Sequence, residues 1–341
     1  MNRILFILVT ALIITGRASG QSFSVRDLLS LSHLQKNEIT HFMYKNGFVP
    51  DKGDDVPDSV QTRFISRISN KKKSYSDATI DLYQQTDCKF FVLYTTSPDD
   101  YLDGRRSLVK SDFIYDKQRE MKRDSSVLFQ KANVSVLAST QTIDSVTKYV
   151  FKLKEKDVPD SIKYAEQLLQ FDSHEFLTNY FGEKNVAKDL FYFSQNELKK
   201  CSVLFSGTPY QAAFVWGNET NLNNLSYVII SNVLPTKQGE KNGVVDRNNA
   251  WKLENGIHSG MALRDLLKLN GGDFYIYGNK SDLAFMVKPS DDGKIDFKKT
   301  AIMFRCDNCY DNPIFDQAEI SALDIVKANL PLKVFDIIIY P

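Results

Sequence analysis

The sequence predicts an α+β fold of two modules, each with helices packed on a mostly antiparallel β-sheet. In both halves, predicted helices come in clusters and are followed by consecutive strands, which favours antiparallel over parallel sheets. With 23 Phe and 16 Tyr against 2 Trp, the chain is rich in aromatic residues that suit strands. The segment at 157–161 (DVPDS) breaks the pattern with a proline. We therefore divide the chain into residues 1–20, 21–156 and 157–341.

Residues 1–20 have the features of a signal peptide. A short basic start with Arg3 precedes an apolar run at 4–14, and small residues follow at Ala18 and Gly20. The apolar run is shorter than the ~20 residues of a membrane-spanning helix. We expect cleavage after Gly20, a secreted or periplasmic protein, and a soluble mature chain with no integral membrane segment.

The overall charge gives no sign of a nucleic-acid partner. The chain has 43 Lys and Arg against 42 Asp and Glu, so no net field steers it toward an anionic polymer. About 320 residues remain after the predicted cleavage, which is enough for two domains with their own cores.

The first module begins with two helices. Ser24 is placed to cap a helix over 25–31, because its hydroxyl can accept a free amide of the first turn. A second helix over 36–46 ends at Gly47 and presents Ile39, Phe42 and Met43 on one face. The remaining expectations are a polar loop at 51–58, strands at 78–83, 89–96, 127–138 and 146–153, and a helix at 98–110.

The second module repeats the order of helices before strands. Ser259 is expected to cap a helix over 261–269, and Gly271 is expected to end it. The other predicted elements are helices at 162–170, 173–181 and 316–329, and strands at 201–205, 211–216, 225–231, 274–277, 283–287, 300–305 and 334–340.

Two short segments occur twice. VRDLLSL at 25–31 is similar to LRDLLKL at 263–269, and DVPDS at 55–59 recurs at 157–161. One interpretation is duplication of a helix-then-sheet unit. The other is reuse of the same residues in amphipathic helices and caps, and the unequal spacing of the two pairs excludes a single repeat period.

The four cysteines allow disulfides in an exported chain. Cys306 and Cys309 form a Cys-x-x-Cys motif, for which the alternatives are a small structural disulfide, two reduced thiols or a redox pair. A zinc site would need two further ligands, and no second Cys pair or spaced His pair supplies them. The residues that follow, 310–313, predict a turn in place of the helix that a redox pair requires. Cys88 and Cys201 are expected either to pair with each other or to be buried singly.

The sequence lacks the motifs of the common enzyme classes. It contains no HExxH, no GxSxG and no phosphate-binding loop, so we expect no cofactor and no metal. Adjacent acids such as Asp99 and Asp100, or Asp54 and Asp55, could serve a glycosidase. No catalytic pair can be chosen among 42 acids, and the catalytic residues are left unknown.

Part of the chain resembles a group of exported proteins. Residues 251–261 (WKLENGIHSGM), the helix with Asn270 and Gly271, and the stretch at 274–278 resemble a C-terminal segment of uncharacterised exported proteins of Bacteroidetes-type bacteria. Residues 193–216 look like part of the same group. The helix leading into strands is also similar, in topology, to helix-plus-meander modules of envelope and inhibitor proteins. That likeness implies protein binding through a sheet and brings no catalytic residues.

These observations favour a non-catalytic binding or envelope-associated protein over an enzyme. Tyr227, Tyr275 and Tyr277 lie in predicted strands, and sheet aromatics suit contact with a protein or glycan partner. Ordinary packing of these tyrosines is the other interpretation. The alternative function is an extracytoplasmic hydrolase that uses paired carboxylates.

Overall fold

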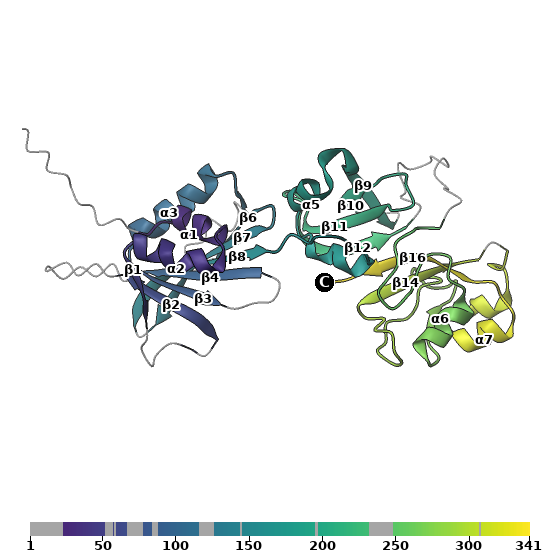
Figure 1. Ribbon diagram of the computed structural model, residues 1–341. Helices are drawn as coiled ribbons and strands as arrows, with labels where there is room; N and C mark the ends of the chain where they lie inside the picture. The colour runs from purple at the N-terminus through teal and green to yellow at the C-terminus, as the bar shows by residue number, and fades with distance from the viewer. Residues whose placement is uncertain are drawn as a thin grey trace, which may run out of the picture. The chain divides into compact units, whose positions relative to one another are not determined.

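The chain forms two compact α+β units with antiparallel sheets, which confirms the predicted fold class (Figure 1). The computed structural model describes residues 23–51, 57, 59–66, 78–83, 88–115, 126–143, 145–194, 197–231, 248–306 and 308–341. The first unit contains Met1–Phe113, Lys117–Leu128 and Val136–Glu155, and the second contains Ile114–Asp116, Phe129–Ser135 and Lys156–Pro341. The predicted signal peptide lies outside the described residues.

Three helices belong to the first unit: α1 (Val25–Ser32), α2 (Lys36–Lys45) and α3 (Pro98–Lys110). Ser24 caps α1 as predicted, since its hydroxyl accepts the Asp27 amide at 3.3 Å. The Asp27 carboxylate in turn accepts the Ser24 amide at 2.8 Å, which completes a capping box.

The first sheet has eight strands in the order β1-β2-β3-β4-β8-β7-β6-β5. Two meanders of four strands therefore meet where β4 and β8 are neighbours. The strands are β1 (Phe48–Asp51), β2 (Val60–Ser66), β3 (Thr79–Tyr83), β4 (Cys88–Thr95), β5 (Ile114–Tyr115), β6 (Val127–Lys131), β7 (Val134–Ile143) and β8 (Val146–Lys156).

The helices of the first unit cover one face of its strands (Figure 1). The Lys89 ammonium on β4 donates to the Ser32 carbonyl at the end of α1 at 2.5 Å. On the opposite face of the sheet, Arg63 of β2 forms a bidentate ion pair with Asp81 of β3, with nitrogen–oxygen distances of 2.6 and 2.8 Å. Asp81 is fully buried, so this pair belongs to the packed part of that face.

The second unit is built from short helices and a six-stranded sheet in the order β14-β16-β12-β11-β10-β9, with a two-stranded sheet of β13 and β15. Its helices are η1 (Ala165–Gln170), α5 (His174–Phe181), η2 (Glu183–Asn185), α6 (Leu263–Asn270), η3 (Pro313–Asp316) and α7 (Ala322–Lys327), of which the three η elements are 3-10 helices. Its strands are β9 (Val186–Ser194), β10 (Glu197–Leu204), β11 (Ala212–Asn218), β12 (Asn223–Ile230), β13 (Tyr275–Tyr277), β14 (Thr300–Arg305), β15 (Glu319–Ser321) and β16 (Lys333–Ile339).

Residues at alternating positions of the six-stranded sheet belong to two apolar clusters, one on each face. Phe214, Val228 and Ile337 join the large core beneath the helices of this unit. Val203 and Ile229 belong to a smaller cluster on the opposite face. Both faces are therefore packed, and the strands here are more continuously apolar than those of a half-exposed sheet.

Some predicted elements are wrong in detail. The single strand expected at 127–138 is a hairpin, because Ala132 adopts a φ of 48° and turns the chain. The helix expected at 162–170 is a 3-10 helix from Ala165, and that at 316–329 is the strand β15 followed by the short α7. Residues 283–287 form turns and isolated bridges in place of a strand.

The predicted cap of α6 is also wrong. Ala262 occupies the N-cap position without a side-chain hydrogen bond, whereas the Ser259 hydroxyl donates to the Phe335 carbonyl at 3.4 Å. The predicted end is confirmed, because Gly271 takes a left-handed φ of 72°. The strands β1, β2 and β9 were not predicted, since their sequences carry proline or several polar residues.

Candidate functional site

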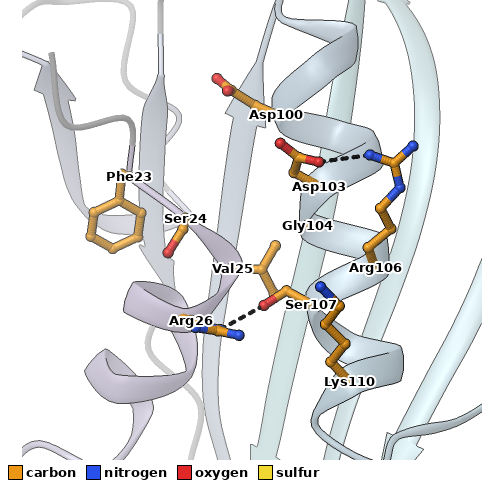
Figure 2. Close-up of a pocket in the computed structure, with 10 residues that line it drawn as sticks. All are labelled: Phe23, Ser24, Val25, Arg26, Asp100, Asp103, Gly104, Arg106, Ser107 and Lys110. Carbon is orange, nitrogen blue, oxygen red and sulfur yellow. Dashed lines mark hydrogen bonds and ion pairs between the residues drawn. The ribbon is translucent and has the colours of Figure 1, made fainter. Parts of the chain in front are cut away.

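A groove of about 390 Å³ lies in the first unit between the first turn of α1 and the length of α3 (Figure 2). Its position follows from close packing of the two helices, because Gly104 on α3 has no side chain where Val25 of α1 approaches. The lining residues are Phe23, Ser24, Val25, Arg26, Asp100, Asp103, Gly104, Arg106, Ser107 and Lys110.

One end of the groove is basic. The Arg26 Nε donates to the Ser107 hydroxyl at 3.0 Å, which holds the guanidinium against α3. Figure 2 shows Lys110 at the same end, one helical turn beyond Ser107. Among the described residues Lys110 has no ion-pair partner, and both cationic side chains are exposed to solvent. This end can receive an anionic group.

The other end of the groove is acidic. Asp100 and Asp103 lie three residues apart on α3 and therefore share a face of the helix. Asp103 is paired with Arg106 at 2.9 Å. Asp100 is partly buried, and this burial, with a smaller effect of nearby acids, raises the pKa of its carboxyl group. Hydrogen bonds from Ser97 and Thr95 oppose the shift only in part. Asp100 is thus a carboxylate that would be stabilised by an incoming cation.

The predicted tyrosine surface is only partly assembled. Tyr275 and Tyr277 lie on one face of β13, with Ile276 buried on the other, and Tyr275 is 52% exposed. Tyr227 lies on β12 in the six-stranded sheet, where its ring contacts that of Tyr340 with centroids 5.7 Å apart. The structure therefore places Tyr275 and Tyr277 together and places Tyr227 on a different sheet.

Cys306 and Cys309 are joined by a disulfide bond directly after β14. Their side chains are buried, and the chain continues into a turn and the short η3. A redox pair needs an accessible sulfur at a helix N-terminus, and neither condition is met here. Cys88 and Cys201 form no disulfide bond, and each is buried. Burial and the nearby Asp189 raise the pKa of Cys201 to about 12, so it is an inert side chain.

A serine and a histidine are hydrogen-bonded in the second unit. His174 Nδ1 lies 2.9 Å from the Ser202 hydroxyl, which also accepts the Trp216 indole N–H at 2.9 Å. Burial, with a smaller effect of Lys188, lowers the pKa of His174 and favours the neutral ring. Ser202 is fully buried, so no substrate carbonyl can reach it. This is a structural polar cluster and not a catalytic dyad.

The described part of the chain offers no group of three or more His, Cys, Asp or Glu side chains that could hold a metal ion. No helix within it has the length and apolar character needed to cross a bilayer. Of the two acidic pairs considered in the sequence, Asp100 lies in the groove, whereas Asp54 and Asp55 lie outside the described residues.

Sequence reasoning did not find the groove, because its walls come from segments about 80 residues apart. Arg26 and Ser107 are in ordinary amphipathic helices, and nothing in their local sequence indicates that they meet. Comparisons with family models, curated proteins and solved structures give no match, so they assign no family and add nothing to the geometry of the groove. The resemblance to exported proteins of Bacteroidetes-type bacteria stays a prediction.

Proposed function

We propose that this chain is an exported, non-catalytic binding protein and that the groove between α1 and α3 is its ligand site. The ligand carries a carboxylate or a similar anionic group, which binds at the basic end. The observation that carries the proposal is the Arg26 guanidinium, held by Ser107 at 3.0 Å beside Lys110.

This arrangement favours binding for two physical reasons. A guanidinium that is already held in place loses less side-chain entropy when it engages a carboxylate. The second cation adds charge-assisted hydrogen bonds, which are stronger than those between neutral groups. The N-terminus of α1 also points its positive dipole end toward this region, although the Ser24 hydroxyl already accepts the Asp27 amide and the Asp27 carboxylate accepts the Ser24 amide.

A hydrolase that uses carboxylates is the second candidate, and the acidic end of the groove is the observation that favours it. Asp100, with its raised pKa, could act as a general acid, and Asp103 could act as a base. We rank this function lower because Asp103 is engaged by Arg106 and exposed to solvent, so the groove does not exclude water from the pair.

The proposal is tested with N-acetyl-triglycine, a probe with a carboxylate and no amino group. Isothermal titration of the purified chain should detect binding, and the double substitution R26A/K110A should weaken it at least tenfold. Arg264→Ala is the matched control, because Arg264 occupies the corresponding position in the similar helix α6, outside the groove. Absence of binding, or equal loss in R264A, would overturn the proposal. Cleavage of the probe that stops in D100N would support the hydrolase instead.

A further inference from the structure

We propose that the groove binds a short peptide with both ends free, about three residues long and extended along α3. Its carboxylate lies at Arg26 and Lys110, and its ammonium group lies at Asp100. This inference rests on the proposed function and adds the class of ligand, its length and its direction.

The charge pattern along α3 sets the direction. Asp100 and Asp103 are on its first turns, and Ser107, which holds Arg26, and Lys110 are on its last turns. Figure 2 shows the acidic side chains at one end of the groove and Arg26 and Lys110 at the other. Asp103 is paired with Arg106, so a ligand with a single negative charge would leave Asp100 unused, whereas a zwitterion satisfies both ends.

The length of the groove sets the size of the peptide. About seven residues of α3 separate the middle of the acidic pair from the middle of the basic end, which corresponds to ~10 Å at a rise of 1.5 Å per residue. An extended peptide covers ~3.3 Å per residue, so three residues span the same distance. The cavity of about 390 Å³ is at the small end of the range of ligand sites, in keeping with a tripeptide.

Asp100 provides the specific contact for the amino end. Burial and two neighbouring acids disfavour its charged form, and hydrogen bonds from Ser97 and Thr95 offset this only in part. No cation is among the described groups that act on it. A ligand ammonium would supply the missing positive charge. The groove is also lined by Phe23 and Val25, which are apolar and hold no side-chain hydrogen-bonding group for a ligand. We therefore expect recognition of the two ends and little selection among small central residues.

The test compares triglycine with two blocked forms, N-acetyl-triglycine and triglycine amide, by isothermal titration at pH 7. We expect triglycine to bind about tenfold more tightly than either blocked form, because each block removes one charge-assisted contact. Asp100→Asn should abolish the advantage of triglycine over the acetylated form and leave binding of the acetylated form unchanged. Asp99→Asn is the control, since Asp99 is exposed on the same helix and does not line the groove.

The outcomes separate the two proposals. If the acetylated peptide binds as tightly as triglycine, the ligand-class inference fails and the anion-binding function stands. If triglycine amide binds as tightly as triglycine, the carboxylate contact is wrong and both proposals fail. If D99N and D100N lose the same affinity, the assignment of the amino end to Asp100 is wrong. Hexaglycine tests the length of the site. Weaker binding of hexaglycine than of triglycine supports a length of three residues, whereas tighter binding of hexaglycine would overturn it.

Discussion

Asp336 lies in β16 opposite Met303 of β14, inside the six-stranded sheet. One oxygen of its carboxyl group, Oδ1, is buried and has no hydrogen-bond partner. Burial raises the pKa of Asp336 to about 6, and a hydrogen bond with Ser231 opposes this only in part. A carboxyl group held in this way favours its neutral form and weakens the fold when it ionises.

The substitution Asp336→Asn should therefore stabilise the protein at neutral pH. The folded pKa lies above the unfolded value of ~3.9, so the penalty is absent below about pH 4, grows between the two values and is complete above about pH 6. We expect D336N to raise the free energy of unfolding by about 3 kcal/mol at pH 7 and by close to nothing at pH 4. Urea unfolding at the two pH values measures the difference.

Asp282→Asn is the control for this prediction, because Asp282 is exposed in a loop of the same unit. It should leave stability unchanged at both pH values. A gain in D336N that is equal at pH 4 and pH 7 would show that the effect is not due to ionisation.

At the scale of single residues, the sequence predicted the features that depend on local chemistry. Ser24 caps α1 and Gly271 ends α6, because a cap needs only a short side chain or a residue that tolerates positive φ. Contacts such as Arg26 with Ser107 could not be predicted, since they depend on how α1 and α3 pack. Ser259 was assigned to the wrong role for a similar reason, because its partner Phe335 is 76 residues away.

At the scale of elements, the long and strongly patterned ones were predicted best. The helix α3 and the hairpin of β3 and β4 lie where the sequence placed them. The elements β1 and β15 were missed, because they have only four and three residues, and β15 also pairs with β13, which is distant in the sequence. Short strands have no periodicity of their own that could distinguish them from loops.

The packing of α3 against α1 depends on Gly104, and Gly104→Ala should destabilise the first unit. A Cβ at this position would lie 2.6 Å from both Phe151 Cζ and Val25 Cγ2. Alanine favours a helix by about 1 kcal/mol, but crowding in a packed core costs about 1–3 kcal/mol. We expect a net loss of about 1 kcal/mol, measured by urea unfolding with far-ultraviolet circular dichroism.

The matched control is Gly272→Ala, since a Cβ there meets no atom within 4 Å. It should change the free energy of unfolding by less than about 0.5 kcal/mol. A stabilised G104A would show that α1 and α3 can separate without cost. The width of the groove would then not be fixed by this contact.

At the scale of the whole molecule, a linear boundary near residue 156 does not describe the second unit fully. The segments Ile114–Asp116 and Phe129–Ser135 also belong to it. The Gln130 side chain donates to the Asp172 carboxylate at 2.8 Å, and the Ala132 amide donates to Glu175 at 3.0 Å. A boundary predicted from the sequence divides the chain at one position. A structural unit is defined by contacts, and these can include segments that lie before that position.

A fragment of residues 157–341 should for this reason be less stable than the same unit in the full chain. It lacks Gln130 and Ala132, and it also lacks Lys156, whose ammonium lies 2.5 Å from Asp172. Each lost hydrogen bond is worth about 0.5–1.5 kcal/mol, so we expect a loss of about 2 kcal/mol or more. Both tryptophans, Trp216 and Trp251, are in this unit, and their fluorescence in urea reports its unfolding alone.

The substitution Glu175→Ala in the whole chain tests the contact with the Ala132 amide even if the fragment does not fold. It leaves the Ala132 amide without its acceptor and should lower the urea midpoint of the tryptophan transition by an amount equivalent to about 1 kcal/mol. Glu183→Ala, at an exposed position of the same unit, should not change it. If E175A and E183A unfold at the same urea concentration, the contact contributes nothing. If the fragment of residues 157–341 has the same urea midpoint as the whole chain, the segments Ile114–Asp116 and Phe129–Ser135 add no stability to the second unit. The boundary of its stable part would then lie at residue 157.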